Sequence, residues 1–312
     1  MAKKRKIKKG RVVFLLSIIF ILLGLIVAGI ISLFISLSNN KALTACAHDM
    51  TMTQSLDFDV NSSSYIIIKE DEIPRTLYAK DEHERIYPAS LTKIMTMMVT
   101  LDHTIDINDT LTVTEEDLSG LIEANASVYG LEVGDKISVH DALYGLILES
   151  GADCANLLRR YIEDQGYDFI SLMNEKATSL GMRDSHFANV TGLDDEENYT
   201  TVYDMALLLH EALQNDNAQA VLTTMYYESP DGYAFESTLS PLESYNSEEA
   251  RALGGKTGFT YIAHLTIATV IEDERNDTYL VVMANASEDG DDGRRAHIED
   301  VHDIMENLIV RW

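Results

Sequence analysis

The sequence predicts a mixed α/β fold of the α+β type, with one antiparallel sheet built from both ends of a single domain. Short β-branched runs occur near residue 65 and again between residues 261 and 283. Segments of helical periodicity fill the middle of the chain, and one more closes it. We therefore expect flanking helices and a helical insert, together with one N-terminal transmembrane helix.

The N-terminal forty residues indicate a membrane anchor. Residues 1–11 form a basic tail with seven lysines and arginines, and residues 12–37 are apolar and uncharged. At 1.5 Å per residue this run is long enough to span the ~30 Å hydrocarbon core. The preceding positive charge favours a cytoplasmic N-terminus, a polar stalk over 38–57 and an extracellular domain over 58–312. A cleaved signal peptide, or lipidation at Cys46, remains an alternative.

The expected elements follow in order from residue 65. A strand at 65–68 pairs with a second one at 76–79, after a turn at Pro74. Pro88 precedes a helix, which buries one face formed by Leu91, Ile94, Met95, Met98 and Val99.

Four more helices are expected before the chain returns to strands. Capping-box patterns begin helices at 138–149 and 201–213, and apolar spacing predicts others at 155–162 and 169–180. Strands at 261–271 and 278–283 flank a polar turn at 272–277. A final helix at 295–310 presents an apolar face, formed by Ile298, Val301, Ile304, Met305, Leu308 and Ile309.

Charge and composition exclude several classes of function. The formal net charge is −27, which disfavours a nucleic-acid partner because phosphate binding requires clustered lysine and arginine. The nine histidines show no His-Glu-x-x-His spacing, so no metal site and no cofactor is predicted. The two cysteines are interpreted as a free stalk thiol, Cys46, and a buried core thiol, Cys154.

Three short motifs carry candidate chemistry. Ser90 and Lys93 lie three residues apart, so they share one helix face, and a desolvated lysine can accept a proton from a serine hydroxyl. Ser150 lies in a loop between two helical segments, where it could relay a proton. Residues 256–258 (Lys-Thr-Gly) lie next to a strand, where glycine permits close approach of a ligand backbone and lysine suits a carboxylate. Each motif alone has a plain structural explanation: Ser90 and Ser150 as helix-capping serines, and residues 256–258 as a glycine-rich turn with a surface lysine.

The order of these motifs is far more specific than any one of them. Ser-x-x-Lys, then a central serine, then Lys-Thr-Gly is the signature order of penicillin-binding proteins and β-lactamases. Over residues 58–312 the sequence resembles the serine-type D-alanyl-D-alanine carboxypeptidases, which are low-molecular-mass penicillin-binding proteins. The resemblance is carried by residues 87–96, 148–153, 187–193, 200–206 and 254–260.

This resemblance implies a DD-peptidase-like fold and a mechanism through an acyl-enzyme. Ser90 would be the nucleophile, Lys93 its base and Ser150 a proton relay. Substrate binding would involve Lys256, Thr257, Gly258 and Phe259. The implied substrates are peptidoglycan stem peptides that lose their terminal D-Ala, and β-lactams are the implied inhibitors.

One position departs from the family pattern. The middle motif usually ends in asparagine, whereas this chain has Ala152, so an amide that would orient the lysine and the substrate is missing. Asp153 is one residue out of register and is expected to point elsewhere. Two alternatives remain: a membrane-tethered penicillin-sensing or wall-binding module with little turnover, and a β-lactamase. For the β-lactamase, Glu196 and Glu197 lie in a plausible loop, but without a Glu-x-x-Leu-Asn pattern.

Overall fold

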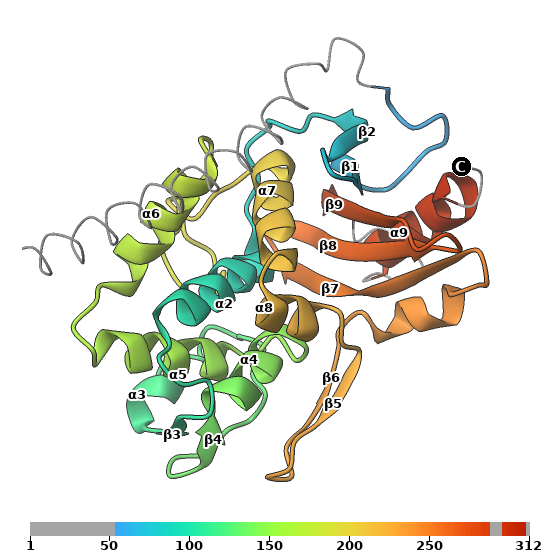
Figure 1. The fold of residues 1–312 in the computed structure, drawn as a ribbon. Helices are drawn as coiled ribbons and strands as arrows, with labels where there is room; N and C mark the ends of the chain where they lie inside the picture. The colour runs from blue at the N-terminus through green and yellow to red at the C-terminus, as the bar shows by residue number, and fades with distance from the viewer. Residues whose placement is uncertain (1–53, 288–294, 310–312) are drawn as a thin grey trace, which may run out of the picture.

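The computed structural model describes residues 54–287 and 295–309 (Figure 1). The predicted tail, the anchor at 12–37, Cys46 and nearly all of the stalk lie outside these ranges. Within them, no helix is both long enough and apolar enough to cross a bilayer.

The central sheet is antiparallel and joins the two ends of the domain. Its strand order is β2-β1-β9-β8-β7, so β7 forms one edge. The strands are β1 (Ser64–Glu70), β2 (Arg75–Lys80), β7 (Ala250–Thr260), β8 (His264–Asp273) and β9 (Thr278–Ala286). Because β1 pairs with β9 along its whole length, the predicted sheet from both ends of the chain is confirmed.

The predicted start of the strand at residue 261 is wrong. Residues 261–263 form the turn between β7 and β8, with Thr260 paired to His264. The glycine-rich segment that resembled a turn is instead the middle of β7. A bulge between Ala252 and Gly254 accommodates it.

The helices lie where periodicity and capping residues predicted them, with small differences at their ends. Helix α5 begins at Ala152 rather than at 155, and Ser138 and Thr201 accept hydrogen bonds from the N–H groups of Asp141 and Asp204, as caps do. The main helices are α2 (Thr92–His103), α4 (Val139–Ile147), α5 (Ala152–Glu163), α6 (Phe169–Leu180), α7 (Val202–Leu213) and α9 (Ala296–Asn307).

Several short elements were not predicted. They are η1 (Ala89–Leu91), β3 (Thr110–Thr112), α3 (Glu115–Leu118), β4 (Lys136–Ser138), α8 (Asp216–Leu222), β5 (Tyr226–Glu228), β6 (Ala234–Glu236) and η2 (Ser240–Tyr245). The β5–β6 hairpin extends away from the sheet, beside the helical region that contains α4 (Figure 1).

Both faces of the sheet are buried, which explains the continuous apolar run in β1. Ile66 and Ile68 belong to the core shared with α2 and α7, whereas Tyr65 and Ile67 belong to a second core under α9. The apolar face predicted for the final helix packs entirely into that second core. Cys154 is fully buried in the first core as a free thiol, as predicted.

A buried carboxylate on α9 binds the segment that directly precedes β1. The Asp300 side chain accepts four hydrogen bonds, from the backbone N–H and the side chain of both Asn61 and Ser62, at 2.6–2.9 Å. Asp300 and Ser62 are both buried, so the two Ser62 donors have no access to water in its place, whereas Asn61 is exposed.

We expect Asp300→Ala to lower the free energy of unfolding by about 3 kcal/mol, because buried donors left without an acceptor cost ~1–3 kcal/mol each. Urea denaturation followed by circular dichroism measures this. Glu306→Ala, an exposed position on the same helix, should change the value by less than about 0.5 kcal/mol. Equal effects of the two substitutions would contradict the role given to Asp300.

Candidate active site

Ser90 lies in the 3₁₀ turn η1, directly before α2, and its side chain does not cap a helix. Ala89, the preceding residue, has a φ of 48°, in the left-handed region that non-glycine residues rarely adopt. Gly192 packs against this turn so closely that a Cβ there would lie 1.8 Å from the Ala89 carbonyl oxygen. The neighbouring loop thus fixes the backbone that presents the Ser90 hydroxyl.

Lys93 is the base candidate, and its ammonium is held between two oxygens. Its Nζ donates to Ser90 Oγ at 3.0 Å and to the backbone carbonyl of Thr191 at 2.6 Å. Burial lowers its pKa from 10.5 to about 7, against an opposing effect of the Asp153 carboxylate. Lys93 therefore exchanges its proton near neutral pH.

Ser150 meets the same hydroxyl from the other side. Its Oγ donates to Ser90 Oγ at 2.9 Å, across sixty residues of sequence. Ser150 lies in the loop between α4 and α5, and its φ of 60° is again left-handed. Three side chains predicted from two motifs, Ser90 and Lys93 from the first and Ser150 from the second, thus form one hydrogen-bonded group.

Asp153 points away from this group, as expected from its register. Its carboxylate is buried and accepts hydrogen bonds from the N–H groups of Tyr129, Gly130 and Leu131 at 2.8–3.0 Å. Ala152 lines the cavity itself, so the position where the family has an amide presents a methyl group.

Strand β7 forms one wall of the site. Thr257, Gly258 and Phe259 line the cavity, and a Cβ on Gly258 would lie 3.0 Å from Ser90 N. The absence of a side chain at residue 258 therefore lets β7 pack directly against the nucleophile.

Lys256 is fully buried and does not contribute to the cavity surface. Its Nζ donates to the Thr257 carbonyl at 2.7 Å. Burial, together with the nearby Lys93, holds its pKa well below the usual value.

The cavity over Ser90 has a volume of about 900 Å³. Sequence reasoning missed several residues of its wall, namely Asn125, Thr191, Thr238, Arg295 and His297. Arg295 and His297 come from the start of α9, far along the chain from every motif. His297 is buried beside Lys256, and burial is the main cause that lowers its pKa to about 4.

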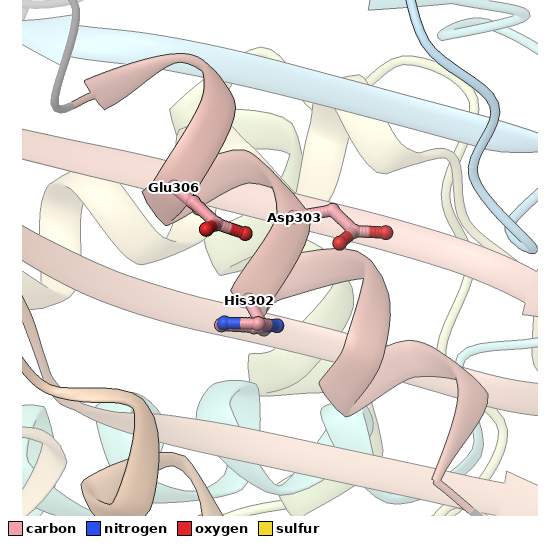
Figure 2. Close-up of side chains that lie close together, drawn as sticks. All are labelled: His302, Asp303 and Glu306. Carbon is pink, nitrogen blue, oxygen red and sulfur yellow. The ribbon is translucent and has the colours of Figure 1, made fainter.

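A group of potential metal ligands lies elsewhere. In residues 54–287 and 295–309, the side chains of His302, Asp303 and Glu306 come within 4.8 Å of one another on α9 (Figure 2). None of them lines the cavity, and the His302 ring stacks on Tyr245 at 4.1 Å between ring centroids. They take no part in the site around Ser90.

The model of the D-alanyl-D-alanine carboxypeptidase family, peptidase S11, matches residues 28–287. The chain belongs to this family. The resemblance inferred from the motifs is thereby confirmed.

Individual relatives agree with the peptidase S11 assignment. The D-alanyl-D-alanine carboxypeptidase DacF of Bacillus subtilis is 32% identical over 160 residues, which make up 50% of this chain and 40% of DacF. The DacD enzyme of Escherichia coli is 33% identical over 156 residues, 48% of this chain and 40% of DacD. The matched region thus spans less than half of these curated relatives.

Solved structures extend the comparison over most of the S11 domain. The Streptomyces K15 DD-transpeptidase superposes with a TM-score of 0.70 at 25% identity, covering 81% of this chain and 100% of that structure. The D-alanyl-D-alanine carboxypeptidase of Mycobacterium tuberculosis H37Rv shares the fold, with a TM-score of 0.69 at 23% identity over 81% of this chain and 92% of that structure. The predicted DD-peptidase-like fold is confirmed.

Proposed function

We propose that this protein is a serine DD-carboxypeptidase, which removes the terminal D-Ala from peptidoglycan stem peptides through an acyl-enzyme on Ser90. The observation that carries the proposal is the contact of Lys93 with Ser90. A buried lysine with a pKa of about 7 donates to the serine hydroxyl at 3.0 Å, so the same nitrogen becomes its acceptor once deprotonated. Family membership supports the same reaction.

In the acylation step, the Ser90 hydroxyl proton passes to Lys93 Nζ while Ser90 Oγ bonds to the carbonyl carbon of the penultimate D-Ala. The tetrahedral intermediate then expels the D-Ala nitrogen. Ser150, whose Oγ lies 2.9 Å from Ser90 Oγ, gives its proton to that nitrogen and takes up directly the proton that Lys93 accepted from Ser90, because the esterified Ser90 oxygen no longer carries one. Water then hydrolyses the ester and restores Ser90.

Negative charge on the substrate would be stabilised at two places, the oxyanion of the tetrahedral intermediate and the terminal carboxylate. The backbone N–H groups of Ser90 and Phe259 would form the oxyanion hole, a contribution of about 3–4 kcal/mol in comparable sites. Thr257 would bind the terminal carboxylate of the substrate, with Arg295 as an additional cation in the cavity wall. A bound carboxylate would favour the protonated form of Lys256, whose pKa is otherwise depressed.

β-Lactams are proposed as inhibitors, because their ring carbonyl would acylate Ser90 and the ester would hydrolyse slowly. A β-lactamase is less well supported, since neither Glu196 nor Glu197 lines the cavity, where a base for rapid deacylation is needed. A penicillin-sensing module with little turnover is the second candidate. The methyl group of Ala152, in place of the orienting amide, favours it.

We further propose that the protein is a single-pass protein of the cell membrane, with its catalytic domain extracellular. The support is the basic tail followed by the uncharged segment 12–37. This places the site on the side of the membrane where cell-wall peptides lie.

Incubating the protein with a fluorescent penicillin, followed by mass spectrometry of its peptides, tests the nucleophile. One adduct on Ser90 is expected. In parallel, a pentapeptide ending in D-Ala-D-Ala should release D-Ala, whereas the same peptide ending in L-Ala should not. An adduct without D-Ala release would favour the sensing module, and a folded protein without an adduct would refute both.

A further inference from the structure

The proton relay Ser150 has a strained backbone, which neighbouring groups must hold in place. Its φ of 60° is unusual for a residue with a side chain. Gly151 N donates to the Gly145 carbonyl and Ala152 N to the Ser127 carbonyl, so the segment after Ser150 is well fixed. The segment before it requires contacts of its own.

Those contacts come from residues 236–238, which we call the clasp. Glu236 N donates to the Glu149 carboxylate at 2.8 Å, and Thr238 N donates to the Leu148 carbonyl at 3.0 Å. Both residues that precede Ser150 are therefore bonded to the clasp.

The clasp also reaches the other wall of the site. The Thr257 hydroxyl donates to the Thr238 hydroxyl at 2.7 Å, and both side chains line the cavity. Thr238 therefore connects the loop at residues 148–151, which we call the serine loop, with strand β7 on the other side of the cavity.

The base of the clasp is rigidly attached to α4. Its first residue, Glu236, is the last residue of the β5–β6 hairpin, in which Tyr227 and Ser229 donate to the buried carboxylate of Asp141 at 2.9 Å. The Tyr227 ring also stacks on Tyr144 at 3.8 Å between centroids. Because α4 ends directly before the serine loop, hairpin and loop are held by the same helix.

We infer that the clasp positions Ser150 for proton transfer to the leaving nitrogen, and that Glu149 and Thr238 are positioning residues. This rests on the proposed function. Glu149 lies beside the relay but acts through the backbone of residue 236. A free Glu149 would leave the strained loop held by one clasp bond instead of two.

The leaving group of the substrate separates this role from general structural damage. An amide nitrogen must be protonated as it leaves, whereas a thiolate need not be. We therefore compare a peptide ending in D-Ala-D-Ala with an acyl-D-Ala thioester. Glu149→Ala should slow kcat/KM for the peptide about 10- to 100-fold, part of the roughly 10²–10⁴-fold that general acid catalysis contributes. The thioester rate should change less than about threefold, because it does not draw on that contribution.

Matched variants complete the test. Glu149→Gln keeps an acceptor oxygen and should restore most of the peptide rate, and Glu228→Ala, on strand β5 of the same hairpin, should behave like the wild type. Thr238→Val keeps the backbone bond to Leu148 and removes only the hydroxyl bond to Thr257, so it should not slow the peptide selectively. Thermal unfolding checks that each variant is folded.

Equal losses on both substrates, or no loss in folded Glu149→Ala, would overturn the inference. The same holds if Glu149→Gln is as slow as Glu149→Ala. Should Glu149→Ala fail to fold, Glu149→Asp, whose shorter side chain withdraws the carboxylate from Glu236 N, decides by the same criterion. A wild-type protein that turns over neither substrate would instead refute the proposed function.

Discussion

Replacing Ser90 with alanine should abolish D-Ala release and covalent labelling by penicillin together. Both reactions begin with attack by the same hydroxyl, so no acyl-enzyme forms without it. We expect kcat/KM to fall about 10⁴-fold or more, with any residual rate coming from the oxyanion hole and substrate binding alone. Continuous detection of free D-Ala measures the rate, and gel fluorescence measures the label.

The fold should tolerate this change. Ser90 is half-buried and its hydroxyl caps no helix. Lys93 keeps its bond to the Thr191 carbonyl when the serine oxygen is gone. A suitable control is Ser127→Ala, also in the cavity wall, where the backbone carbonyl rather than the side chain bonds to Ala152. Labelling of Ser90→Ala at the rate of that control would place the nucleophile elsewhere.

The sequence predicted the elements whose signals are local. The helices that begin after Ser138 and Thr201 carry their own caps, and the helix after Pro88 carries its own apolar face. Strand β7 could not be recognised in this way. Its glycines disfavour a strand in isolation, and only pairing with β8, through a bulge at residues 252–254, makes them extended. The three-residue strands of the β5–β6 hairpin are likewise too short for a periodic signal.

The same distinction applies within the site. Ser90, Lys93 and Ser150 were identifiable because their order along the chain is a known pattern, and the structure brings them within hydrogen-bonding distance. The Thr191 oxygen that accepts a hydrogen bond from Lys93 belongs to the backbone, so its role could not be predicted from the residue type. Arg295 and Thr238 reach the cavity only through the packing of α9 and of the clasp, which depends on contacts distant in sequence.

Some of the many acidic residues are buried and have a structural role, which the net charge alone does not reveal. Asp153, Asp141 and Asp300 are buried and accept hydrogen bonds from loop or strand-entry donors. Each holds a segment that leads to the site or to the sheet. Part of the strongly negative charge is therefore buried, where it holds these segments in place.

The rate of acylation by penicillin should depend on pH through the protonation state of Lys93. This rate should rise with pH through a midpoint near 7, because only the neutral amine of Lys93 can accept the Ser90 proton. With its ordinary pKa of 10.5, about one lysine in 3,000 would be neutral at pH 7, whereas burial brings this fraction to about half. Stopped-flow measurement of the acylation rate between pH 5 and 9 gives the profile.

Lys93→Met should slow acylation about 10³-fold or more and remove the midpoint, since no base then contacts the hydroxyl. Lys256 is the other buried lysine whose pKa is depressed, so it must be separated from Lys93. Lys256→Arg is permanently charged in the measured range and should keep the midpoint near 7 even if its rate is lower. If the midpoint disappears in Lys256→Arg and persists in Lys93→Met, the titrating base is Lys256. The hydrogen bond between Lys93 and Ser90 would then hold the serine in place without activating it.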